Sequence, residues 1–103
     1  MIIYNVTIKI TKEAHDDWLN WMKTVHVPDV INTGLFVDAS IRKLLYVEKD
    51  DGITYSIQYR LTEMDKLHEY QEKYAKALQA DHTERYKDQF VAFRTLMTEE
   101  QQF

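Results

Sequence analysis

The chain has 103 residues, which gives room for one hydrophobic core and for no second folded domain. Its composition is 45% hydrophobic and 29% charged, which is ordinary for a globular protein and argues against disorder. The net charge is −4, and the basic residues are interspersed with acidic ones throughout. Binding nucleic acid requires clustered positive charge, so we expect no nucleic-acid partner.

The sequence contains no cysteine, which excludes disulfides, thiolate metal sites and thiol nucleophiles and favours a cytoplasmic location. The first ten residues alternate between apolar and polar types, unlike a signal peptide. No apolar stretch approaches the roughly 20 residues of a membrane-spanning helix. We therefore expect a soluble protein that has no membrane partner.

The first strand is predicted over residues 1–10 because the pattern repeats every second residue. Tyr4, Val6, Ile8 and Ile10 share one face, which we expect to pack against helices. Asn5, Thr7 and Lys9 share the other face.

A helix is predicted over residues 12–26, with Thr11 as its N-cap. Its apolar residues recur at helical spacing: Ala14, Trp18, Trp21, Met22 and Val25. The residue before a proline avoids helical geometry, so an interruption is predicted at His26-Val27-Pro28. A one-turn continuation follows over residues 28–33 and ends at Gly34.

The second strand is predicted over residues 36–48, with a bulge or burial on both faces near Arg42-Lys43. Asp50-Asp51-Gly52 predicts a hairpin turn. The third strand, residues 53–61, alternates cleanly between apolar and polar residues.

A second helix is predicted after a capping-box pattern at residues 62–65. Its stripe follows helical spacing: Met64, Leu67, Gln71, Tyr74 and Leu78. A second capping-box pattern at residues 81–84 predicts a kink or a new helix near residue 80. The last strand is predicted over residues 90–97, and residues 99–103 form a tail beyond a single domain of residues 1–98.

The order β-α-β-β-α-β predicts an α+β, ferredoxin-like fold. Right-handed crossovers give a four-stranded antiparallel sheet of order 4-1-3-2, with the helices on one face. The edge strands are then the second and the fourth.

Both predicted edge strands are apolar on both faces, at residues 44–47 and 90–93. Exposed apolar edges invite pairing with other chains. Burying them would contribute several kcal/mol at about 25 cal/mol/Å². We therefore predict a homodimer, with coverage of the edges by loops or by the tail as the alternative. Arg42, Arg60 and Arg94 are assigned to the polar face of the sheet, which such a dimer would enclose.

Four segments carry a resemblance to a known family: MIIYNVTIKI, WLNWMKTVHVPDVINTG, GITYSIQY and FVAFRTL. The run Trp-x-x-Trp…His-x-Pro-Asp…Thr-Gly is their most specific part. On these segments, which cover nearly the whole chain, the protein resembles the family catalogued as domain of unknown function 4286. The resemblance implies a ferredoxin-like, dimeric α+β barrel domain. It implies no activity and transfers no functional residues.

The architecture is more distantly similar to dimeric α+β barrel monooxygenases and haem-degrading proteins, which hold ligands between helices and sheet. Haem-degrading relatives carry an asparagine on the first strand that faces the pocket and a histidine on the second helical region. Asn5 and His82 stand at comparable positions. Asn5 is predicted on the face opposite the helices, so the similarity does not extend to haem chemistry.

The motifs exclude several chemistries. The chain has two glycines, which cannot form the glycine-rich loops that bind nucleotide phosphates. Neither serine lies in a nucleophile elbow. The four histidines share no metal-ligand spacing, so no metal and no cofactor are predicted.

The candidate ligand-binding residues are Tyr4, Trp21, His26, Tyr59 and His82. Each has a structural alternative that we consider more common. His26 can be a base or can stabilise a helix end, with Asp29 in position to orient its ring. The aromatic residues can stack on a ligand or simply fill the core. His82 can meet an anion together with Arg85 or can lie on a solvated helix face.

Two functions are compatible with these patterns. The first is a homodimeric domain that binds a small ligand or acts in regulation or assembly without catalysis. The second is a cofactor-independent monooxygenase or isomerase of the dimeric α+β barrel type. A pocket with convergent polar groups between helices and sheet would favour an enzyme.

Overall fold

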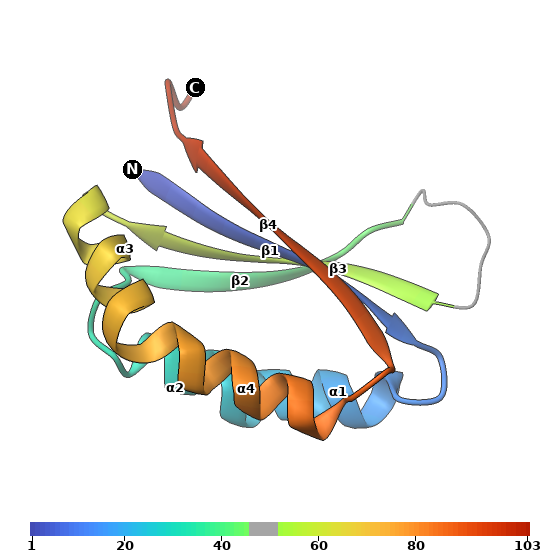
Figure 1. The fold of residues 1–103 in the computed structure, drawn as a ribbon. Helices are drawn as coiled ribbons and strands as arrows, with labels where there is room; N and C mark the ends of the chain where they lie inside the picture. Colours follow the sequence, from blue (N-terminus) through green and yellow to red (C-terminus); the bar gives the residue numbers. More distant parts are fainter. Residues whose placement is uncertain (46–51) are drawn as a thin grey trace.

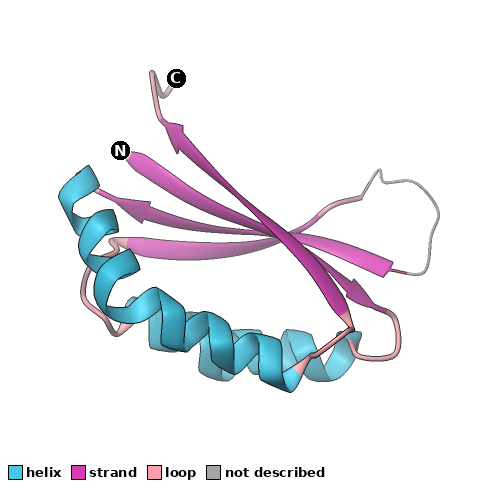
Figure 2. Ribbon diagram, viewed as in Figure 1, coloured by secondary structure: helices cyan, strands magenta, loops and turns pink. Residues whose placement is uncertain are grey.

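The computed structural model describes residues 1–45 and 52–103. Within these ranges the strands are β1 (Ile2–Thr11), β2 (Asp38–Lys43), β3 (Gly52–Leu61) and β4 (Phe90–Thr98). The helical segments are α1 (His15–Trp21), η1 (Met22–His26), α2 (Val27–Ile31), α3 (Met64–Tyr70), η2 (Gln71–Ala75) and α4 (Lys76–Arg85). The two η segments are π-helical turns within longer helices. All helices lie on one face of the sheet (Figures 1 and 2).

The four strands form one antiparallel sheet of order β2-β3-β1-β4. This confirms the predicted order, with β1 and β3 in the centre and β2 and β4 at the edges. The βαββαβ arrangement is the ferredoxin-like fold predicted from the sequence.

The alternation predicted for β1 is confirmed on the helix side of the sheet. Tyr4, Val6, Ile8 and Ile10 are at most 9% exposed and pack against the helices. The opposite face, which none of the described helices covers (Figure 2), carries a short polar network. There Asn5 donates to Thr7 at 3.0 Å and accepts from the Ser56 hydroxyl at 2.5 Å.

The first helical region departs from the prediction at its start and in the residues before Pro28. It begins at His15 rather than at residue 12, after a turn in which the Thr11 hydroxyl accepts from the Ala14 N–H at 3.4 Å. The predicted interruption before Pro28 is wrong, because Val27 keeps helical geometry and the π-helical turn η1 leads directly into α2. The predicted left-handed stop is confirmed, since Gly34 has φ +80°.

The second helical region also contains a π-helical turn, and this turn shifts its buried face. Leu67, Tyr70 and Ala75 are buried, whereas the predicted stripe members Gln71 and Tyr74 are exposed. The spacing of five between Tyr70 and Ala75 matches one π turn. The capping box predicted at residues 62–65 does not form at the N-cap, which is Glu63 without a side-chain bond. The break predicted near residue 80 is wrong, because α4 runs from Lys76 to Arg85 without interruption.

The strand β2 begins at Asp38, two residues later than predicted, and Phe36 is instead a buried residue that precedes it. Part of the predicted strand, residues 46–48, and the first two residues of the predicted turn, Asp50 and Asp51, lie outside the described residues. Leu45 is 80% exposed where the described part ends.

The connection from α4 to β4 decides which side chains of β4 face the helices. The chain turns after Tyr86, and Asp88 adopts a left-handed backbone with φ 63°. Aspartate tolerates this conformation better than most residues do. In the resulting register Arg94 pairs with Val6, on the helix side, so its assignment to the polar face is wrong. Phe93 pairs with Thr7 and points to the open face.

Candidate functional site

A small cavity lies between the sheet and the helices. Its volume, taken as the space open to the centre of a water molecule, is about 40 Å³. Its polar lining residues are Tyr4, His26, Tyr59, Tyr70, Gln79, His82, Thr83 and Arg94, and its apolar lining residues are Val6, Ile8, Met22, Ile57, Phe90 and Ala92. Thr83 and Arg94 are exposed, so the lining reaches solvent where α4 meets β4. Eight polar side chains from both layers therefore converge on one interior space.

His82 is buried in a set of aromatic rings. The indole Nε1–H of Trp18 donates to Nε2 of His82 at 2.9 Å. An imidazole nitrogen that accepts a hydrogen bond carries no proton, so His82 is neutral with its proton on Nδ1. The rings of Phe90 and Tyr86 lie 4.4 and 5.6 Å from the His82 ring. This histidine does not lie on a solvated helix face, as the structural alternative supposed.

His26 lies beside His82 in the same group of rings. The two imidazole centroids are 5.6 Å apart, and Trp21 stacks on His26 at 5.0 Å with planes 28° apart. The guanidinium of Arg85 lies over the indole of Trp21, 5.5 Å from the ring centroid. His26 lies in a continuous helix, so the role of stabilising a helix end does not apply to it.

Burial sets the protonation of both imidazoles. Desolvation lowers the pKa of His82 to about 4, and the neighbouring His26 and Arg94 contribute to this lowering. Burial also lowers the pKa of His26, and the nearby carboxylates of Asp29 and Asp81 oppose this only in part. Both histidines are therefore neutral at pH 7.

Three phenol rings and one guanidinium form the other end of the cavity. Tyr4 lies 6.0 Å from Tyr59 and 6.1 Å from Tyr70, measured between ring centroids. Arg94 Nε donates to the Tyr4 hydroxyl at 3.0 Å. Burial raises the pKa of Tyr59 and of Tyr70, so both hydroxyls keep their protons and remain donors.

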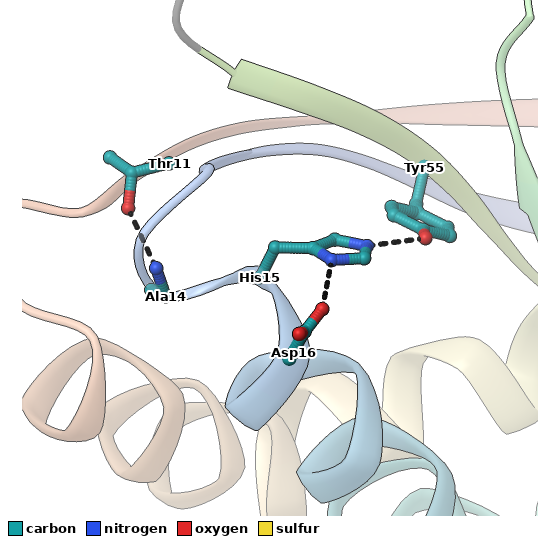
Figure 3. A network of polar contacts seen from close by, with 5 residues as sticks. All are labelled: Thr11, Ala14, His15, Asp16 and Tyr55. Carbon is teal, nitrogen blue, oxygen red and sulfur yellow. Dashed lines mark hydrogen bonds and ion pairs between the residues drawn. The ribbon is translucent and has the colours of Figure 1, made fainter.

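A second polar cluster lies at the start of α1 (Figure 3). His15 Nδ1 is 2.8 Å from the Asp16 carboxylate, and its Nε2 is 2.7 Å from the Tyr55 hydroxyl. Because Nδ1–H donates to the carboxylate, Nε2 accepts from the Tyr55 hydroxyl. Tyr55 does not line the cavity, and Asp16 is exposed. This chain of contacts ties α1 to β3.

Four of the five predicted candidates line the same cavity: Tyr4, His26, Tyr59 and His82. Trp21 is in ring contact with both histidines. The sequence pattern does not reveal Tyr70 and Arg94, because helical spacing places Gln71 rather than Tyr70 on the inner stripe and β4 shows no alternation. A strand that is apolar on both faces shows no alternation, so its pattern does not indicate which face points to the core.

Other classes of site receive no support from the described ranges, 1–45 and 52–103. No group of three or more potential ligands that could hold a metal ion occurs in these ranges. Within them, no helix is both long enough and apolar enough to cross a bilayer.

Several solved structures share this fold at low sequence identity. A dimeric ferredoxin-like protein from an uncultured marine organism is 12% identical, with TM-score 0.70 over 100% of this chain and 98% of that one. HapK from Hahella chejuensis is 8% identical, with TM-score 0.71 over 100% and 97%. A point mutant of SnoaB, a cofactor-independent oxygenase from Streptomyces nogalater, is 13% identical, with TM-score 0.67 over 98% and 95%. At these identities the likeness establishes the fold alone.

A search of curated protein sequences found no match to this chain. A family model described as a domain of unknown function (DUF4286) matches residues 1–100. This match spans nearly the whole chain and agrees with the resemblance seen in its sequence. The protein therefore belongs to the DUF4286 family.

Proposed function

We propose that this protein is a homodimeric domain that binds a small organic molecule in the cavity between helices and sheet. The observation that carries the proposal is the convergence of phenol, imidazole, amide and guanidinium groups on one space inside an otherwise apolar core. Ligand sites typically combine an apolar lining with a few convergent polar groups.

A purely structural core would not need these residues. Each polar group costs about 1–3 kcal/mol when it is buried without a partner, whereas leucine or phenylalanine at the same position would not. Tyr59, Tyr70 and His82 are at most 5% exposed. The bond from Trp18 satisfies Nε2 of His82, and within the described residues no buried side-chain nitrogen or oxygen lacks a partner, so the remaining polar atoms face open space that a ligand could occupy.

The size of the cavity limits what it can hold in this conformation. A water molecule needs about 10–15 Å³ by the same measure, so 40 Å³ holds about three heavy atoms. The remaining part of a larger ligand would extend out of the cavity at the junction of α4 and β4, where Thr83 and Arg94 meet solvent.

The homodimer is supported by the uncovered face of the sheet. Val91 and Phe93 are 66% and 62% exposed there, and Met97 on the same face is 38% exposed. Strands spaced by about 4.8 Å and rising by about 3.3 Å per residue give this face a flat area on the order of 500 Å². Its side chains can thus supply an accessible area close to the about 800 Å² per partner of a stable interface. One structural neighbour is described as dimeric.

Light scattering combined with a ligand screen tests this proposal. We expect a dimer of the 12.4 kDa chain at micromolar concentration. Among small organic acids, phenols, flavin and haem, at least one should raise the melting temperature, and Tyr70→Phe should reduce that rise. Tyr74→Phe, which changes an exposed tyrosine on the same helical region, is the control. A monomer, or a stabilising compound that is indifferent to Tyr70→Phe, would count against the proposal.

A cofactor-independent oxygenase is the second candidate, and the neutral imidazoles favour it. A neutral histidine beside a cavity can accept a proton from an acidic phenol or enol, which is the step that prepares such substrates for oxygen. SnoaB, a structural neighbour, is an oxygenase of this kind. Substrate-dependent oxygen uptake that His26→Gln abolishes would support this candidate, and its absence across a panel of polyphenols would count against it.

A further inference from the structure

We infer that the ligand is a small organic anion, of the carboxylate or enolate class, whose charged group lies in the cavity among Arg94, the buried phenols and His82. This inference rests on the proposed function, because it names the chemistry of the molecule bound at that site. Three features of the lining carry it: its charge, its free hydrogen-bond donors and the pairing of Arg94.

The charge of the lining is positive. Among the described residues that line the cavity, none carries a carboxylate, and Arg94 is the one with a permanent charge. The two imidazoles add no negative charge in any protonation state. A cavity wall with one cation and no anion favours a ligand of charge −1.

The lining also offers several free hydrogen-bond donors. The bond from Trp18 occupies Nε2 of His82, which leaves Nδ1–H as a free donor. Within the described residues no buried side-chain nitrogen or oxygen lacks a partner. Since no partner for His82 Nδ1, Tyr59 Oη or Tyr70 Oη occurs in that part of the chain, these atoms still contact open space. All three residues line the cavity, so their donors converge on its interior.

The pairing of Arg94 differs from that of two other arginines. Arg60 forms an ion pair with Asp38, and Arg85 lies 3.6 Å from a carboxylate oxygen of Asp17. In the described part of the chain, Arg94 has no such ion pair, and its Nε donates to the neutral Tyr4 hydroxyl. Its two terminal nitrogens can therefore form the paired hydrogen bonds that arginine makes with a carboxylate. The Tyr4 bond holds the guanidinium at the cavity wall.

Size agrees with this assignment. A carboxylate group has three heavy atoms, which is about the number that the cavity holds. The charged group of acetate therefore fits as the structure stands, and the body of a larger acid would extend through the junction of α4 and β4. There Phe90 and Ala92 offer apolar contact.

The test compares anions with neutral molecules of the same shape. Acetate and benzoate would be titrated into the intact protein at pH 7, followed by amide NMR shifts, with acetamide and benzamide as the neutral partners. We expect benzoate to bind at least about tenfold more tightly than benzamide, because hydrogen bonds to a charged group are stronger than those to a neutral one. Acetate should show the same preference over acetamide.

Two matched pairs of variants test whether the anion binds in this cavity. Arg94→Gln should weaken benzoate binding at least about tenfold, whereas Lys87→Gln, which removes the same charge from an exposed position, should not. Tyr70→Phe should weaken it several-fold, and Tyr74→Phe should leave it unchanged. Circular dichroism of each variant verifies that it is folded, and Tyr70→Phe tests the site independently if Arg94→Gln fails to fold.

The possible outcomes distinguish a failure of the anion assignment from a failure of the proposed function. Benzamide binding equal to that of benzoate, or benzoate binding unaffected by Arg94→Gln, would overturn the anion assignment. If neutral or cationic compounds bind instead and Tyr70→Phe weakens them, the small-ligand function stands and only the anion is wrong. If the protein binds nothing from either class, both fail.

Discussion

The two faces of the sheet are built from the same four strands but differ in what covers them. On the helix side, side chains are enclosed by the chain itself, and Trp18, Ile10, Ile57, Leu61 and Leu67 are fully buried. On the other side, Asn5, Ser56 and Thr7 form a polar centre beside the exposed apolar residues of β4. The first face is complete within one subunit.

The proposed function divides between these two faces. We propose ligand binding on the helix side, where burial keeps imidazoles neutral and phenols protonated. We propose self-association on the open side, where apolar residues remain in contact with water. Substitutions on the two faces should therefore affect different measurements, and the predictions below test that separation.

The largest expected effect is on the helix side. Trp18→Ala should lower the free energy of unfolding by about 3–5 kcal/mol, because it leaves a large cavity and removes the donor to His82. Trp18→Phe keeps most of the packing and should cost about 1–3 kcal/mol for the unpaired nitrogen. Urea denaturation measures both, with the fully exposed Phe103→Ala as control. A loss below about 1 kcal/mol in Trp18→Ala would contradict the enclosed core.

The second effect depends on pH. The pKa of His82 is about 4 in the folded protein and about 6.5 in the unfolded chain, so the unfolded chain binds more protons between these values. The free energy of unfolding should therefore fall as pH decreases from about 6.5 to 4, by roughly 3 kcal/mol at about 1.4 kcal/mol per pKa unit. The lowered pKa of His26 adds to this slope in the same direction.

Denaturation curves between pH 4 and 7 verify this dependence. His82→Gln should flatten the slope, since glutamine does not titrate, even though the variant is less stable throughout. His68→Gln, at an exposed histidine, should keep the slope of the natural protein. An unchanged slope in His82→Gln would show that other groups cause it.

The third effect concerns the open face. Phe93→Asp places a carboxylate in the expected interface. It should raise the dimer dissociation constant at least about 30-fold, which corresponds to a loss of about 2 kcal/mol or more of association free energy. Sedimentation velocity over a range of concentrations measures the constant. Val25→Asp, on the outer surface of the helices, is the matched control. If both variants dimerise like the natural protein, the open face is not the interface.

The smallest effect is at the seam between the helices. The Tyr86 hydroxyl donates to Asp17 at 2.7 Å and accepts from Arg85 Nε at 3.1 Å, which joins α4 to α1. Tyr86→Phe should cost about 1 kcal/mol, the usual net value of such a bond. Thermal unfolding detects this loss, and the dimer should remain intact. Dissociation of the dimer would contradict the separation of the two faces.

Strand alternation and element order predicted the fold from the sequence. β1 and β3 each have one apolar and one polar face, so their orientation could be read residue by residue. β4 begins with Phe90, Val91, Ala92 and Phe93, which carry no alternation. The placement of Arg94 therefore depends on a turn whose geometry the sequence pattern does not reveal.

The sequence pattern predicted both helical regions, but it predicted only part of the face that each of them buries. Regular spacing placed Val25 and Tyr74 on the apolar stripes, yet these residues are 40% and 37% exposed. One π-helical turn in each helical region adds a residue and rotates the face that follows it. Four of the five site candidates line the cavity and Trp21 contacts both histidines, although helical spacing alone placed neither His26 nor His82 on an inner face. Whether they bind a ligand stays a prediction.

The connection at Asp88 sets the orientation of both Phe93 and Arg94. Inserting one residue between Tyr86 and Phe90 would move every following side chain of β4 to the opposite surface. Phe93 would then fill the interior, and Arg94 would project from the outside. Under the proposed function, a family member that differs in the length of this connection would lose the proposed anion site and the apolar outer strand in a single step, so the two traits are expected to diverge together.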